Sequence, residues 1–241
     1  MKKAFICILF FCISCSDISL SDIMTPKVVK AVRNKDKGMN SELAELEKKA
    51  EKYKKIIGEK IEAGEQLSDV YETIGYKYLY KQVWELAIDN LNKSISLGNN
   101  TDSVHQRIAT AYANRGSELN SFEDFSKAEF HYRKSLEKNY LNNDAKYGLS
   151  ILLFFKLNKK PEGLSIIKEL CDKNKNYYQG RIAYARMLYD MNNKESALNE
   201  YRNLYVDMKE SNTASDKDIN VIQVNINQLM TELSRGGAND K

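Results

Sequence analysis

Proline and cysteine are scarce in this sequence. Its 241 residues include only 2 prolines and 11 glycines, so residues that break helices are few. That scarcity favours long helices over a fold made of many turns. Of its 4 cysteines, only Cys171 lies beyond the first fifteen residues, which argues against a disulfide framework and against a cysteine-based metal site. Cys171 is expected to be a small, partly buried packing residue.

The sequence also lacks a strong excess of one charge. Its 37 Lys and Arg residues nearly balance its 33 Asp and Glu residues, which leaves a formal net charge of +4. Both signs are interspersed along the chain. A balance this even does not indicate binding to nucleic acid or to an anionic membrane surface.

Recognisable catalytic motifs are absent as well. The sequence has no glycine-rich phosphate loop, no dinucleotide fingerprint, no nucleophile elbow and no H-E-x-x-H zinc motif. The two histidines, His105 and His131, are too few for a metal site without further ligands, so we expect them to be packing or surface residues. The carboxylates Glu123, Asp124 and Glu129 are expected on a solvated face. We therefore predict neither an enzyme nor a cofactor nor a metal.

The first residues have the pattern of an export signal. "MKK" is a short basic region, and "AFICILFFCI" is an apolar run too short for a transmembrane helix, which needs about 20 apolar residues. The following "CISC" resembles a bacterial lipobox, although Cys12 stands where leucine is usual. The resemblance implies that residues 1–14 are a signal peptide and that Cys15 carries lipid that holds the protein to a membrane. An ordinary signal peptide cut nearby, or an uncleaved apolar anchor, is the alternative.

Residues 15–40 lack sustained helical periodicity and are expected to be a tether between lipid and domain. A helix is predicted over 41–64, after a possible N-cap at Asn40 or Ser41. Its apolar residues form a short heptad seam. Either a dimerising coiled coil over 41–61 or a helix that caps the next segment fits this seam, and we favour the cap. The seam residues are Leu43, Leu46, Ala50, Tyr53 and Ile57.

Small residues recur at a nearly constant interval in the middle of the chain. Residues with little or no side chain lie at positions 87, 128, 163 and 197, so that consecutive separations are 41, 35 and 34. Each is preceded by a helical segment with aromatic and small residues, such as Tyr71, Gly75 and Tyr78. Ile151 breaks the small-residue pattern in the third copy. An insertion at 117–124 accounts for the longer first separation.

A period near 34 with this pattern resembles the tetratricopeptide repeat over residues 65–210. The proline that often ends such a repeat is absent here. The resemblance implies an all-α solenoid of about four helix-turn-helix repeats, with an N-terminal and a C-terminal capping helix. The second cap is expected within 211–241 and should end at Gly236 and Gly237; a partner-binding amphipathic helix is the alternative. Its apolar stripe comprises Ile219, Ile222, Ile226, Leu229 and Leu233.

In the tetratricopeptide family the first helix of each pair lines a concave groove, which implies a partner-binding surface here. Its tyrosines offer large contact area with little rotamer entropy to lose, which suits protein or peptide recognition, although ordinary packing between repeats would also explain them. The family's clamp for a C-terminal carboxylate is not expected, because Glu72 and Tyr76 stand where lysine and asparagine are usual. The predicted groove residues are Glu72, Tyr76, Leu79, Tyr80, Gln106, Thr110, Ala113, Asn114, Leu152, Phe155, Lys156, Gln179, Ile182, Arg186, Tyr189 and Asp190.

These features predict a lipid-anchored adaptor or assembly factor of the bacterial cell envelope. Its partner would be a protein or peptide held in the groove, and the membrane would be engaged through the N-terminal lipid. The alternative is an accessory protein that holds a small hydrophobic ligand or a transporter component in the groove or near 117–124. Fold alone does not decide between them.

Overall fold

The computed structural model describes residues 37–57, 61–211 and 215–239. The predicted signal peptide, the lipidation site at Cys15 and most of the tether lie outside these residues. The described parts contain ten helices and no strand, as the all-α prediction requires. They are α2 (Lys37–Ile57), α3 (Ile61–Tyr80), α4 (Trp84–Ser96), α5 (Asp102–Leu119), α6 (Phe122–Lys138), α7 (Asn143–Phe155), α8 (Lys160–Lys173), α9 (Tyr178–Asp190), α10 (Lys194–Ser211) and α11 (Asp216–Asn239).

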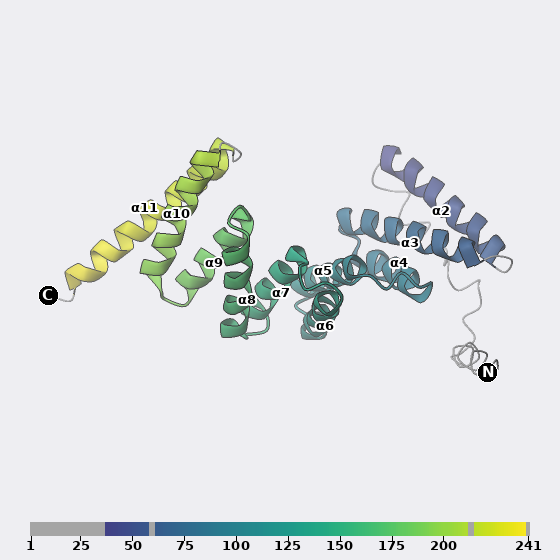
Figure 1. The fold of residues 1–241 in the computed structure, drawn as a ribbon, viewed down its shortest axis with the longest axis horizontal. Coiled ribbons are helices and arrows are strands. Elements are labelled where there is room, and N and C mark those ends of the chain that lie inside the picture. Colours follow the sequence, from purple (N-terminus) through teal and green to yellow (C-terminus); the bar gives the residue numbers. More distant parts are fainter. Residues whose placement is uncertain (1–36, 58–60, 212–214, 240–241) are drawn as a thin grey trace. The chain divides into compact units, whose positions relative to one another are not determined.

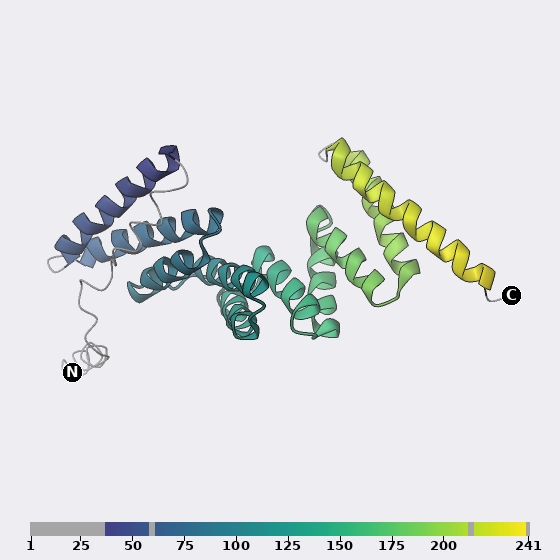
Figure 2. The same ribbon diagram turned by 180° about the vertical axis from the view of Figure 1, so that it is seen from behind.

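The chain divides into two compact units, residues 1–49 and 50–241. Helices α3 to α10 belong to the second unit and form four antiparallel pairs in sequence order (Figures 1 and 2). Within a pair the two helices pack along their length, and each pair contacts the next through its second helix. Helix α11 packs on α10. The predicted arrangement of successive helical hairpins is therefore confirmed.

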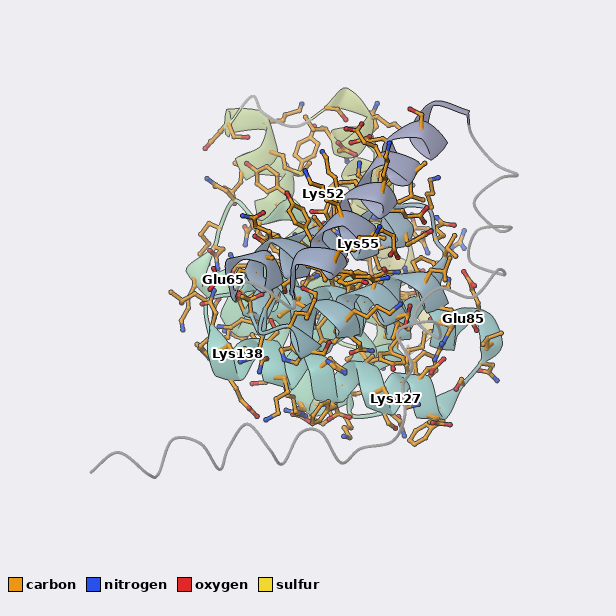
Figure 3. The ribbon with its side chains drawn as sticks, turned by 90° about the vertical axis from the view of Figure 1, so that its right-hand side faces the viewer. Lys52, Lys55, Glu65, Glu85, Lys127 and Lys138 are labelled. Carbon is orange, nitrogen blue, oxygen red and sulfur yellow. The ribbon has the colours of Figure 1, made fainter. Side chains whose placement is uncertain are left out.

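Charged side chains of both signs point outward from these helices, as Glu85, Lys127 and Lys138 show (Figure 3). Several of them form exposed pairs one helical turn apart, such as Lys127 with Glu123 at 2.6 Å. Such pairs contribute little to stability, typically about 0.3–0.5 kcal/mol. The exposed surface of the second unit therefore has the mixed charge that the composition indicated.

The small residues at the repeat interval are buried as predicted. Ala87, Ala128 and Ala197 are all 0% exposed. A Cβ at Gly163 would lie 2.7 Å from the Ser150 carbonyl oxygen, so only glycine allows this approach of α8 to α7. These residues let the helices of each pair pack closely.

One close approach was missed by the sequence pattern. A Cβ at Gly148 would lie 2.4 Å from the ring of Tyr132, which packs from the preceding hairpin. Gly148 lies outside the repeating positions. Those positions allow the two helices of one hairpin to approach, whereas Gly148 allows one hairpin to approach the next. Ile151, which broke the pattern, is only half-buried.

The turn inside each hairpin contains one residue with left-handed backbone. Asparagine tolerates this conformation because its short polar side chain can bond locally, whereas glutamine has no such advantage. These turns reverse the chain in the absence of the repeat-ending proline. The left-handed residues are Gln82 (φ 59°), Asn120 (φ 51°), Asn158 (φ 54°) and Asn192 (φ 60°).

The insertion at 117–124 lengthens two helices instead of forming a loop. Helices α5 and α6 have 18 and 17 residues, against 13 and 14 in α7 and α8. Only Asn120 and Ser121 connect them, and the Ser121 hydroxyl caps α6 by accepting from the Asp124 amide. The longer hairpin leaves Leu119 and Phe122 at its tip 66% and 69% exposed.

The first and last described helices have bounds that differ from those predicted for the two capping helices. Helix α2 spans Lys37–Ile57 and α3 begins at Ile61, so the described bounds of the first helix differ from the predicted 41–64. Whether α2 caps the repeats or dimerises stays a prediction. Helix α11 continues through Gly236 and Gly237 to Asn239, because glycine permits a left-handed helix end without imposing one.

Candidate functional site

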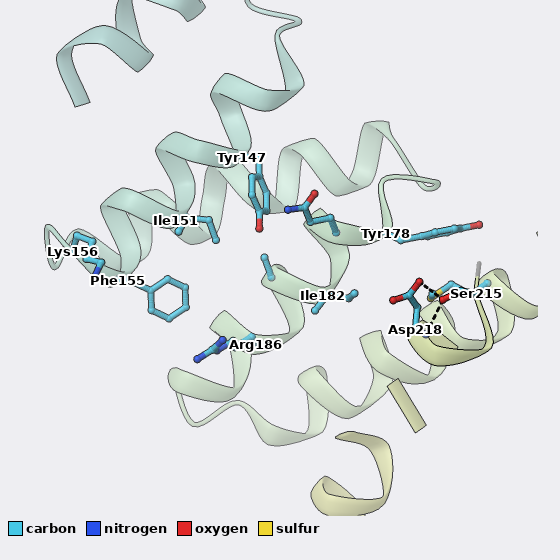
Figure 4. Close-up of a pocket in the computed structure, with 12 residues that line it drawn as sticks. Tyr147, Ile151, Phe155, Lys156, Tyr178, Ile182, Arg186, Ser215 and Asp218 are labelled. Atoms are coloured by element: carbon cyan, nitrogen blue, oxygen red, sulfur yellow. Dashed lines mark hydrogen bonds between the residues drawn. The ribbon is translucent and has the colours of Figure 1, made fainter. Parts of the chain in front are cut away.

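A large pocket lies among α7, α9 and the segment where α10 and α11 meet (Figure 4). Its volume is about 840 Å³. We call it the α7–α9 pocket. It is lined by Tyr147, Ile151, Phe155, Lys156, Tyr178, Gln179, Ile182, Ala183, Arg186, Met208, Ser215 and Asp218.

A second pocket of about 340 Å³ lies between α5 and α7, and we call it the α5–α7 pocket. It shares Tyr147, Ile151, Lys156 and Gln179 with the first, so the two form one continuous groove. Its other lining residues are Gln106, Thr110, Ala113, Asn114, Ser117, Tyr132, Asp144, Gly148, Leu152 and Tyr177.

Helical periodicity places the lining residues on one stripe of each first helix. On α7, Tyr147, Ile151 and Phe155 follow at intervals of four residues, and on α9 Ile182 and Arg186 do the same. Residues four apart lie on the same face of a helix. Because the second helix of each hairpin packs against the opposite side, these stripes remain open to the groove.

Charges in the α7–α9 pocket are separated between its two ends. Phe155, Lys156 and Arg186 lie toward one side, and Ser215 and Asp218 lie toward the other (Figure 4). The Arg186 guanidinium lies 5.6 Å from the centre of the Phe155 ring, a cation–π arrangement. Between these ends the wall is mainly apolar.

The α5–α7 pocket is the more polar part of the groove. The Gln106 amide donates to the Thr110 hydroxyl at 3.2 Å, and the Asn114 amide donates to the Thr110 carbonyl at 2.9 Å. The Tyr132 hydroxyl lies 3.2 Å from that of Thr110, and burial raises the pKa of Tyr132 to about 12. These neutral groups provide hydrogen-bond donors and acceptors along the groove.

Most predicted groove residues of the second, third and fourth hairpins line these pockets. Leu152 differs from the others because it is mainly a core residue: it is only 2% exposed and packs in the cluster that contains Phe125 and Tyr132. The predicted residues that line a pocket are Gln106, Thr110, Ala113, Asn114, Leu152, Phe155, Lys156, Gln179, Ile182 and Arg186.

The predicted residues of the first hairpin line neither pocket. Glu72 forms an ion pair with Arg107 and accepts from the Asn99 amide at 2.6 Å. The Tyr76 ring lies under the same guanidinium, 4.9 Å from its centre. Glu72 and Tyr76 therefore connect the first hairpin to the second. Leu79 is half-buried and Tyr80 is exposed.

Tyr189 and Asp190, at the end of α9, also lie outside the pockets. The Tyr189 hydroxyl donates to the Glu232 carboxylate of α11 at 3.1 Å, and its ring packs against the core that α10 and α11 share. Sequence reasoning missed Tyr178, Ser215 and Asp218 as groove residues. Periodicity could have placed Tyr178, four residues before Ile182, but no local pattern brings the start of α11 to the groove.

The remaining candidates for chemistry are groups that pack or form ion pairs. Asp124, expected on a solvated face, is instead buried and accepts from the Arg115 guanidinium at 2.7 Å. His105 Nε2 donates to Asn100 Oδ1 at 2.8 Å, and its Nδ1 lies 2.9 Å from His131 Nδ1, so His131 must donate that bond. Burial, with His105 adding to it, lowers the pKa of His131 to about 4. Burial also raises the pKa of the Cys171 thiol to about 12. Within the described residues, no group of three His, Cys, Asp or Glu side chains could hold a metal.

The described helices are short or polar by comparison with a membrane span. None of those helices combines the length and the apolar character needed to cross a bilayer.

Comparison with known proteins identifies the class of fold. No protein-family model matches the sequence, and no curated protein matches it. Solved structures do match. BtubC from P. vanneervenii has a TM-score of 0.61 at 10% identity, with 83% of this chain and 85% of that chain covered.

Two further structures are of tetratricopeptide repeat (TPR) proteins. TTC0263 of Thermus thermophilus, a thermophilic TPR protein, has a TM-score of 0.53 at 13% identity, with 70% and 82% of the two chains covered. YrrB, a TPR protein with an unusual peptide-binding site, has a TM-score of 0.51 at 18% identity, with 69% and 79% covered. At such identities the likeness shows the fold alone: this chain is an all-α solenoid of the tetratricopeptide type.

Proposed function

We propose that this protein is a binding protein whose groove holds an extended segment of a partner protein. The observation that carries the proposal is the continuity of the groove, because four residues line both pockets. A groove that runs across three successive hairpins matches a chain better than a compact ligand. Tyrosines, amides and apolar side chains alternate along it, which is the mixture that suits peptide recognition. YrrB, of similar fold, has a peptide-binding site.

We also propose that the protein is exported and held to a membrane of the bacterial cell envelope by lipid on Cys15. The sequence pattern of residues 1–15 supports this, as does the polar segment that follows and provides a tether. Anchoring would keep the groove close to the membrane and to partners there. The protein would then act as an adaptor or assembly factor.

Site-specific photocrosslinking in cells that produce the protein tests the groove. A photoreactive residue at Phe155, which is 38% exposed, should give an adduct with a partner protein. The same residue at Ser165, exposed on α8 and outside both pockets, is the matched control. Tyr76 serves as a second position beyond the groove. The proposal fails if Phe155 captures no protein or only those that Ser165 captures.

Mass spectrometry of the mature N-terminus tests the anchor. The native protein should begin at Cys15 and carry acyl chains, and it should fractionate with membranes. Cys15→Ser should abolish both the acyl mass and the membrane association. An unmodified terminus on the native protein would refute lipidation.

A small hydrophobic ligand is the second candidate occupant. It is favoured by the volume of the α7–α9 pocket, about 840 Å³, and by its apolar wall of Ile151, Ile182 and Met208. Sites for small molecules commonly span about 300–1,000 Å³. Native mass spectrometry of the purified protein would reveal such a ligand as a fixed added mass, and its loss from Ile182→Asp would place it in this pocket.

A further inference from the structure

We propose that the α7–α9 pocket selects a partner segment in which a large apolar side chain lies between an acidic side chain and a basic one. This inference rests on the proposed function and names the class of segment that the groove accepts. The acidic side chain would face Lys156 and Arg186, and the basic side chain would face Asp218.

The cationic end carries two charges that the protein leaves unneutralised. Lys156 and Arg186 are both exposed, and neither forms an ion pair with any described residue. The buried cations of the same two helices behave differently: Lys146 of α7 lies 3.0 Å from Glu169, and Arg181 of α9 lies 2.7 Å from Glu200. The two buried cations are thus neutralised by carboxylates of the protein itself. Lys156 and Arg186 are not, so they are available to a carboxylate of the partner.

Arg186 is also held in position for such a contact. Its guanidinium rests against the Phe155 ring, which limits its rotamers while its N–H groups remain free to donate. A guanidinium presents two parallel N–H groups to a carboxylate, and this bidentate geometry favours acidic side chains over neutral amides.

The opposite end carries a fixed carboxylate. The Ser215 hydroxyl donates to Asp218 Oδ2 at 2.6 Å, and the Asp218 amide donates to the same hydroxyl at 3.2 Å. This reciprocal capping at the start of α11 orients the side chain. Among the described residues no cation pairs with Asp218, and its second oxygen has no hydrogen bond there. A lysine or arginine of the partner would form an ion pair with the Asp218 carboxylate.

The wall between the two ends is apolar. Ile151 and Ile182 point into the space between α7 and α9, and the Tyr147 ring lies above them (Figure 4). A large apolar side chain of the partner would lose its contact with water there, which favours binding by about 25 cal/mol for each Å² removed. The two charged ends then set which apolar segment is accepted, because rim charges contribute more to specificity than to affinity.

The acidic group is a side chain rather than a chain end. Lys156 lines both pockets, so the groove continues past the cationic end toward Gln106 and Asn114. A segment whose acidic residue faces Lys156 can therefore continue along the polar α5–α7 pocket, where amides and hydroxyls meet its backbone. A terminal carboxylate would leave that half of the groove unused.

Fluorescence anisotropy with four synthetic peptides tests the inference. All are acetylated and amidated, so that no chain end is charged, and each has a central leucine and phenylalanine. Their flanks are acidic and basic, acidic and acidic, basic and basic, or neutral. The acidic–apolar–basic peptide should bind about three- to tenfold more tightly than the neutral one, the size expected for two partly exposed ion pairs.

Substitutions that change the charge at either end of the pocket should change the order of the four peptide affinities. Arg186→Glu leaves Lys156 opposite one new carboxylate, so it should remove the preference for an acidic flank at that end. Asp218→Lys should move the preference to the acidic–apolar–acidic peptide. Asp218→Asn is a milder second variant, because lysine at that position could weaken α11. Arg202→Glu, the same charge change on the exposed side of α10, should leave the order unchanged. Circular dichroism and thermal unfolding confirm that each variant is folded.

Two results would overturn the inference: equal binding of all four peptides, or an order that Arg186→Glu leaves unchanged. Equal binding that Ile182→Asp abolishes would identify an apolar site without charge selection. The proposed function has a separate readout, since crosslinking at Phe155 reports a partner in the groove whatever its charges. Loss of charge selection with a surviving Phe155 adduct would therefore refute only the inference.

Discussion

The side chain of Leu91 on α4 occupies the space that a side chain at Gly75 on α3 would need. A Cβ at position 75 would lie 2.6 Å from Leu91 Cγ and 3.2 Å from the Ala87 carbonyl oxygen. Leu91 is itself 0% exposed, so it has no room to move away. The first hairpin therefore depends on the absence of a side chain at one point of α3.

Gly75→Ala should destabilise the protein by about 1–3 kcal/mol, because overpacking between α3 and α4 outweighs the better helix propensity of alanine. Gly64→Ala in the same helix is the matched control, since no atom lies within 4 Å of a Cβ there. It should stabilise by about 0.5–1 kcal/mol. Urea unfolding measures both, and equal shifts in the two variants would contradict the packing of α3 on α4.

Arg181→Ala should be among the more destabilising changes on the fourth hairpin. Arg181 is buried and donates to Glu200 at 2.7 Å and to the Lys175 carbonyl at 3.2 Å, so its removal strands partly buried acceptors. We expect a loss of about 2–4 kcal/mol. Lys168→Ala, which breaks an exposed pair with Asp172, should leave the stability nearly unchanged. Similar losses in thermal unfolding for the two variants would refute this distinction.

Gln82→Gly should stabilise the protein by about 0.5–1 kcal/mol. Gln82 has a positive φ of 59°, a conformation that costs a side chain about 1–2 kcal/mol and glycine almost nothing. The greater freedom of glycine in the unfolded chain offsets part of that gain. Gln82→Asn should lie between the two, as Asn120 and Asn158 occupy the equivalent turns. A loss of stability on chemical denaturation of Gln82→Gly would contradict the left-handed turn.

The histidine pair should make stability depend on pH. Burial lowers the pKa of His131 to about 4. Burial also lowers the pKa of His105; the positive charges of Lys138 and Lys134 lower it further, and Glu137 opposes them. The unfolded chain, with histidine pKa near 6.5, then binds more protons than the folded one between about pH 4 and 6.5. The stabilisation is thus complete above pH 6.5 and is lost as pH falls toward 4.

His131→Gln isolates this contribution. Its unfolding free energy should fall less than that of the native protein over the same window, by about 1–3 kcal/mol, since one pKa unit is about 1.4 kcal/mol and solvent reaches part of the ring. The carboxylates are common to both proteins and cancel in the comparison. Parallel curves for the two proteins would show that the pair titrates normally.

Sequence reasoning assigned to the groove face some residues that line it and others that do not. It placed Phe155, Lys156 and Arg186 on the groove face, because helical spacing fixes the face on which a residue lies once the helix is known. It also placed Glu72 and Tyr189 there, and the structure instead gives them partners in Arg107 and Glu232. Those pairs join residues that lie 35 and 43 positions apart in sequence, so no local pattern indicates them.

The sequence by itself determined the helices, their pairing and the small residues where they meet, since apolar spacing and side-chain volume act within a turn or a hairpin. Only the tertiary structure decided that 117–124 extends α5 and α6, and that the start of α11 brings Ser215 and Asp218 to the groove. The physical reason is distance along the chain. The rotation of one hairpin on the next is set by contacts such as Gly148 with Tyr132, in which each partner belongs to a different repeat.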